Sequence, residues 1–146
     1  MSRLRTSSGA LVVLGCAGWV ALSGVSKACD PVAFANAVSA HGVVPVAGID
    51  VVVWVVPIVE VATGMVAVYS IAAARSARWG VLPLAAVFMC LAAYLAVVAL
   101  GAPAGAGCGC GLSQEAVRSW WPLVVRNVAI GGLLGLIGVK GGLGPS

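Results

Sequence analysis

Long apolar runs separated by short polar segments define the hydrophobic pattern of this chain. Four stretches are apolar over most of their length: residues 9–25, 46–74, 81–100 and 121–139. A helix needs about 20 mostly apolar residues to cross a hydrocarbon core roughly 30 Å thick. The pattern therefore predicts an all-α integral membrane protein, a bundle of four spanning helices forming one domain over residues 1–146.

Prolines and tryptophans mark the ends of the predicted spans. The second stretch lies within an apolar run over residues 43–74 that is longer than one crossing needs and contains Pro45 and Pro57. Its beginning is therefore expected to lie in the interface or to kink at proline. Trp79, Trp120 and Trp121 stand at span ends, where tryptophan is enriched in membrane proteins. These positions support the boundaries of the four spans.

The composition excludes two other classes of protein. Hydrophobic residues make up 62% of the 146 residues and charged residues only 8%, and the mean hydropathy is +1.13. A soluble domain carries about 25% charged residues, so a soluble globular domain and a disordered chain are both excluded. The net charge of +4 is spread over separate loops. It therefore carries information on topology and predicts no nucleic-acid partner.

Lysine and arginine in short loops predict the orientation, because they concentrate on the cytoplasmic side of a membrane. Lys27 and Arg118 fall on one predicted side, together with Asp30 and Glu115. The other side holds Arg3, Arg5, Arg75, Arg78 and Lys140. This distribution predicts that both termini are cytoplasmic and that the loops 26–42 and 101–119 face outward.

The N-terminal stretch has an alternative interpretation as a secretory signal. A basic start and an apolar run precede Ser26-Lys27-Ala28, which resembles a small-residue cleavage site. Cleavage there would leave three spans and an external N-terminus. The charged Lys27 between the two small residues favours an intact first helix instead.

Three of the five cysteines fall in the predicted outer loops, where an oxidising compartment permits disulfides. Cys108 and Cys110 are separated and flanked by glycine, and Gly109 can adopt the positive φ that brings the two sulfurs together. A disulfide in so small a ring is expected to be strained and active in exchange. The pattern predicts a redox-active dithiol of Cys108 and Cys110, with Cys29 as a resolving thiol.

The cysteines also permit other interpretations. The outer pair can be a static staple, or one of its members can pair with Cys29. A Cys₃His set of Cys29, His41, Cys108 and Cys110 has the ligand types of a zinc site, but its spacing matches no finger pattern, and we predict no metal. Cys16 and Cys90 lie at similar depths in the first and third spans and can form a buried pair, although buried cysteine usually behaves as a small hydrophobe.

Glu60 and Arg126 are the ionisable residues deepest in the predicted spans. Charged side chains inside a membrane normally pair with one another or line a polar cavity. Counting from the cytoplasmic ends, Glu60 and Arg126 lie at nearly equal depth, about 21–23 Å from the basic residues. We expect them to form a salt bridge. It would act either as a clamp between two helices or as the polar floor of a pocket that holds a quinone headgroup.

Four short sequence patterns follow one another along the chain. They are Ser26-Lys27 with Asp30-Pro31 and Phe34, Pro57 with Glu60 and Gly64, Cys108-Gly109-Cys110-Gly111, and Arg126-Asn127. In this order the chain resembles the MauE family of DoxX-like membrane proteins over nearly its whole length. The resemblance implies a DoxX-like four-helix protein of the inner or plasma membrane that takes part in methylamine utilisation.

The resemblance also implies partners. Proteins of the MauE family are held to help process, export or mature the small subunit of methylamine dehydrogenase, which is dense in disulfides. A thioredoxin-like protein (MauD) commonly works beside them, and the family is described as redox-associated. The client of this chain is expected to be that subunit or another exported protein with disulfides.

Three functions therefore compete. The first is a thiol–disulfide component, an oxidoreductase if it is an enzyme, which passes electrons to a quinone, to a partner or to the Cys16 and Cys90 pair. The second is a small transporter or metal carrier that uses the outer cysteines, with Glu60 and Arg126 in the path. The third is a structural subunit that holds another protein among lipids.

Overall fold

Five helices make up the part of the chain that the computed structural model describes, which is residues 2–73, 78–101 and 119–140. They are α1 (Ser2–Cys29), α2 (Pro31–His41), α3 (Val46–Ala72), α4 (Arg78–Gly101) and α5 (Trp121–Lys140). All but α2 are long and apolar enough to cross a membrane. The prediction of an all-α protein with four membrane-spanning helices is confirmed.

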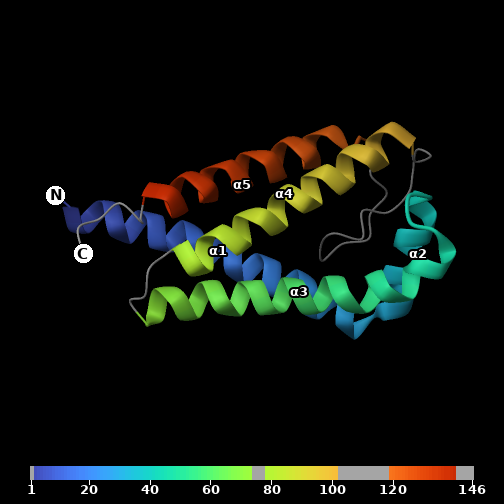
Figure 1. Ribbon diagram of the computed structural model, residues 1–146, viewed down its shortest axis with the longest axis horizontal. Helices are drawn as coiled ribbons and strands as arrows, with labels where there is room; N and C mark the ends of the chain where they lie inside the picture. The colour runs from blue at the N-terminus through green and yellow to red at the C-terminus, as the bar shows by residue number, and fades with distance from the viewer. Residues whose placement is uncertain (1, 74–77, 102–118, 141–146) are drawn as a thin grey trace.

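The four long helices run side by side along the length of the molecule (Figure 1). The closest packing joins α1 to α3 and α4 to α5, and α3 also packs against α4. The short helix α2 lies at the end of the bundle where α1 ends and α3 begins (Figure 1). The end of α4 and the start of α5 lie at that same end, which we call the α2 end.

The seam between α1 and α3 is built from small residues. The buried positions of α3 recur every three or four residues, as one face of a helix requires; they are Val53, Pro57, Glu60, Gly64, Ala67 and Ser70. A Cβ at Gly64 would lie 2.7 Å from the carbonyl oxygen of Ala17, and one at Gly24 would lie 2.8 Å from that of Pro57. The two helices therefore meet backbone to backbone, a packing mode common in membranes.

The hydrophobic core divides along the bundle. Away from α2, all four long helices share one cluster, which includes Val13, Ala67, Leu84 and Leu134. Toward the α2 end, two separate clusters replace it. One joins α4 to the start of α5, and the other joins α2 to α3 through Phe34, Val38 and Val53. The pairs α1/α3 and α4/α5 therefore share one core away from α2. Toward the α2 end, each side has its own apolar cluster.

The predicted outer loop 26–42 is wrong in detail, because most of it is helical. Helix α1 continues to Cys29 instead of ending at Val25, and α2 follows after one residue. The Asp30 carboxylate accepts a hydrogen bond from the Ala33 N–H at 2.9 Å, and Pro31 begins α2 without needing a donor. Gly42, with φ +67°, ends the helix in the left-handed conformation.

Candidate functional site

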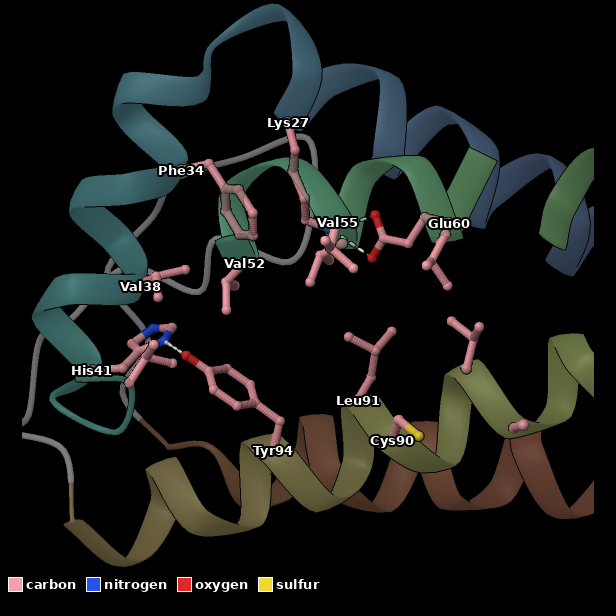
Figure 2. Close-up of a pocket in the computed structure, with 15 residues that line it drawn as sticks. Lys27, Phe34, Val38, His41, Val52, Val55, Glu60, Cys90, Leu91 and Tyr94 are labelled. Carbon is pink, nitrogen blue, oxygen red and sulfur yellow. Dashed lines mark hydrogen bonds and ion pairs between the residues drawn. The ribbon is translucent and has the colours of Figure 1, made fainter. Parts of the chain in front are cut away.

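A cavity of about 550 Å³ lies where the core divides, between α2 and α3 on one side and α4 on the other (Figure 2). Its walls are mostly valine and leucine side chains. Two pairs of polar side chains interrupt this apolar lining: Lys27 with Glu60, and His41 with Tyr94. Cys90 of α4 also faces the cavity. This combination makes the cavity the candidate functional site.

The first polar pair is a buried salt bridge between α1 and α3. The Lys27 Nζ donates to both Glu60 carboxylate oxygens at 2.6 Å and to the Ser23 hydroxyl at 2.9 Å. The two charged side chains are only 6% and 3% exposed. The ammonium also lies 5.5 Å from the centroid of the Phe34 ring. Because an ammonium has three donors, the lysine is fully hydrogen-bonded and the pair is electrically neutral.

This geometry corrects the predicted partner of Glu60. The expected salt bridge with Arg126 is replaced by the one with Lys27, and the Arg126 side chain is exposed. Glu60 and Arg126 do border one small crevice together. The partner differs because α3 packs closely against α1, and because Lys27 belongs to α1 and not to a loop.

Thr63 of α3 and Asn127 of α5 form hydrogen bonds within their own helices. The Thr63 hydroxyl donates to the Val59 carbonyl. The Asn127 side chain donates to the Leu123 carbonyl at 2.7 Å. Such bonds to the preceding turn satisfy a polar side chain inside a membrane helix.

The second polar pair connects α2 to α4. The Nδ1 atom of His41 lies 2.6 Å from the Tyr94 hydroxyl oxygen, and His41 is 3% exposed. The His41 ring meets the ring of Trp120, the residue before α5, in a T-shaped contact with centroids 5.2 Å apart. His41 is therefore a residue of the cavity wall. The sequence signal that could have placed His41 on a helix is Gly42, which directly follows it and ends α2.

The described cysteines occupy three different environments and are all free thiols. Cys29 is exposed at the last residue of α1, Cys90 is exposed on α4 at the cavity, and Cys16 packs against the shared core. The considered pair of Cys16 and Cys90 is not formed. The predicted dithiol, Cys108 and Cys110, lies outside the described residues.

Metal ligation finds no support in the described ranges. There, no group of three or more histidine, cysteine, aspartate or glutamate side chains is placed to hold an ion. The alternative Cys₃His set lies partly outside those ranges. Within them, His41 is engaged by Tyr94 in the cavity wall.

Comparison with protein families gives a match over nearly the whole chain. The family model described as methylamine utilisation protein MauE matches residues 5–140. A search of curated proteins and a search of solved structures each found no match. Together with four apolar helices of spanning length, the family match identifies a multi-pass membrane protein.

Proposed function

Since the chain belongs to the MauE family of methylamine utilisation proteins, we propose that it is the membrane component of a system that forms disulfides in an exported protein. The observation that carries this proposal is the pair Cys108 and Cys110, set among glycines in the segment between α4 and α5. The helix ends that flank this segment, the end of α4 and the start of α5, lie at the α2 end of the bundle (Figure 1). Cys29, the last residue of α1, is exposed.

The proposed orientation places the α2 end outside the plasma membrane and both termini in the cytoplasm. The distribution of basic residues supports it. Lys27, one of the two basic residues assigned to the outer side, is neutralised by Glu60 inside the bundle and no longer counts as a loop charge. Arg118 then stands against five basic residues on the other side.

We predict that a membrane-impermeant maleimide added to intact cells will label Cys29 but not an engineered cysteine in Arg75→Cys. Cys29 is exposed at the α2 end, whereas position 75 falls in the sequence between α3 and α4, whose adjoining ends lie at the opposite end of the bundle. Labelling is read by peptide mass spectrometry, and lysed cells give the full-reactivity control. Labelling at position 75 in intact cells would reverse the orientation.

The proposed chemistry is thiol–disulfide exchange. A client thiolate attacks the Cys108–Cys110 disulfide, one S–S bond breaks as a mixed disulfide forms, and the second client thiolate then releases the client. The client loses two electrons and two protons and gains a disulfide, while Cys108 and Cys110 become thiols. A lipid-soluble quinone takes up the two electrons and two protons, becomes a quinol and restores the disulfide.

The proposed client is an exported protein that needs disulfides, such as the methylamine dehydrogenase small subunit. A thioredoxin-like protein of the MauD type is the proposed partner in exchange. Cys29 is the proposed resolving thiol, because it is free and exposed at the same end of the bundle. A structural subunit with no redox role is the competing function.

We predict that Cys110→Ser, or the reciprocal Cys108→Ser, will accumulate a covalent adduct with the client or the thioredoxin-like partner. The remaining loop thiolate can attack a disulfide of the oxidised client or partner, and the mixed disulfide then lacks the neighbouring loop thiol that would resolve it. If Cys29 resolves the mixed disulfide, the double variant Cys29→Ser/Cys110→Ser will accumulate more. The adduct is detected on a non-reducing gel and should disappear with reductant.

Cys16→Ala is the matched control, because Cys16 packs against the hydrophobic core and should trap nothing. The functional readout is the amount of client with its disulfides formed. If both loop variants mature the client as well as the parent does, the dithiol is dispensable and the structural-subunit function is favoured.

A further inference from the structure

The cavity between α3 and α4 opens toward the lipid. Val55 and Val59 of α3 line it and are 49% and 46% exposed. Ala86 and Cys90 of α4 line it from the other side and are also exposed. Exposed side chains of two neighbouring spanning helices face the hydrocarbon core, so a ligand can enter from within the bilayer. The cavity is therefore suited to a lipid-soluble molecule.

The two polar pairs stand apart on the cavity wall. In Figure 2, Lys27 and Glu60 lie by Val55, whereas His41 and Tyr94 meet where α2 faces α4. The carboxylate of Glu60 accepts hydrogen bonds, and the Tyr94 hydroxyl both donates and accepts them. The cavity thus combines an apolar body with two polar positions of mixed hydrogen-bonding character.

These features select among lipid-soluble ligands. An acyl chain can make no hydrogen bond to the Glu60 carboxylate or to the Tyr94 hydroxyl, so it would gain nothing from the polar positions of the wall. A free ion is disfavoured, because the one charged pair is internally neutral and the remaining wall is mostly apolar. A quinone ring carries carbonyl acceptors when oxidised and hydroxyl donors when reduced. Groups that both donate and accept suit both forms.

We propose that this cavity binds the head of a lipid-soluble quinone, with its apolar tail leaving between α3 and α4. The volume of about 550 Å³ lies within the roughly 300–1,000 Å³ usual for small-molecule sites. The role of the bound quinone as electron acceptor rests on the proposed function: it takes two electrons and two protons from the reduced dithiol. The binding itself needs only the described residues.

Protection of Cys90 tests binding directly. The full-length protein in lipid nanodiscs is treated with N-ethylmaleimide, with or without decylubiquinone, whose ring is fully substituted and does not alkylate thiols. Peptide mass spectrometry follows Cys90, with Cys29 as the internal control outside the cavity. We expect saturating decylubiquinone to slow alkylation of Cys90 about tenfold, as for a site that is about 90% occupied, and to leave Cys29 unchanged.

Decylbenzene, which has the tail but no carbonyls, is the matched ligand control. Equal protection by decylbenzene would mean an apolar pocket filled by lipid chains, and no protection by either compound would mean no site at Cys90. Both results overturn the proposal.

Two variants locate the quinone. Tyr94→Phe removes one hydroxyl and should weaken protection up to about tenfold, the value of one hydrogen bond, while Tyr69→Phe, outside this cavity, should not. Ala86→Phe narrows the opening at an exposed position and should abolish protection without affecting folding. Unchanged protection in both cavity variants would place the quinone elsewhere.

The same assay separates this proposal from the proposed function. In Cys108→Ser/Cys110→Ser, disulfide exchange is lost but protection of Cys90 should persist, because the double variant leaves unchanged the described residues from which the proposed site is built, among them Glu60 and Tyr94. Exchange without protection would refute the quinone site alone. Protection without exchange would refute the thiol–disulfide function alone.

Discussion

Glu60→Gln is expected to lower the free energy of unfolding by about 3–5 kcal/mol, because it leaves the buried ammonium of Lys27 without its counter-charge. Lys27→Met is expected to cost a similar amount by leaving the carboxylate unpaired. The two side chains are only 6% and 3% exposed, so the charge that remains is largely shielded from solvent. Thermal unfolding of the purified variants in one detergent measures the losses.

The double variant Lys27→Met/Glu60→Leu is expected to regain most of that stability. Replacing both members of a buried ion pair by apolar residues is often neutral, whereas removing one member is not. The cost of the double variant should therefore be well below the sum of the single costs. Additive costs would mean that the two side chains do not interact.

Arg126→Gln is the control that separates the two possible partners of Glu60. Arg126 is exposed and takes no part in the salt bridge, so its replacement should cost much less than the about 3–5 kcal/mol expected for Glu60→Gln. A large loss, coupled to that of Glu60→Gln, would restore the pairing expected from depth alone.

Gly64→Ala is expected to destabilise the bundle by about 1–3 kcal/mol, the usual cost of overpacking. The added Cβ would stand 2.7 Å from the Ala17 carbonyl oxygen and 2.9 Å from the Ala21 Cβ. Backbone atoms cannot swing away as a long side chain can, so α1 and α3 must separate. Gly24→Ala, opposite the Pro57 carbonyl, should behave in the same way.

Gly18→Ala and Gly132→Ala are the matched controls, because a Cβ at either position meets no atom within 4 Å. Alanine favours a helix more than glycine does, so these two changes should be neutral or slightly stabilising. Thermal unfolding under one set of conditions compares all four variants. A loss of equal size in the controls would attribute the effect to helix propensity and not to the seam.

The spanning helices were predictable because length and apolarity alone decide whether a segment crosses a membrane. Helix α2 was missed for the converse reason: its 11 residues are too few to span, and they lie between two apolar runs. The sequence nevertheless contains the signals for both ends of α2. Asp30-Pro31 is a helix start, and Gly42 is a helix stop.

The partner of Glu60 was mispredicted because counting residues gives depth but not neighbourhood. Equal depth does not say which helix lies beside Glu60, so it cannot decide between Lys27 and Arg126 as the partner of the carboxylate. The small residues Gly24 and Gly64 carried the missing information, since they mark the faces on which α1 and α3 approach. No residue pattern in the sequence indicated the cavity, because the cavity forms where the helix pairs α1/α3 and α4/α5 separate toward α2.

The salt bridge also has a consequence for biogenesis. Lys27 and Glu60 are 33 residues apart in the chain, so α1 is synthesised and inserted before its counter-charge exists. Lys27 lies near the end of α1, so its long side chain can extend to the lipid headgroups before Glu60 is synthesised. Glu60 lies near the middle of α3, where its short side chain cannot reach the headgroups. The third helix should therefore leave the insertion machinery already paired with the first, which makes α1 and α3 the earliest assembled half of the protein.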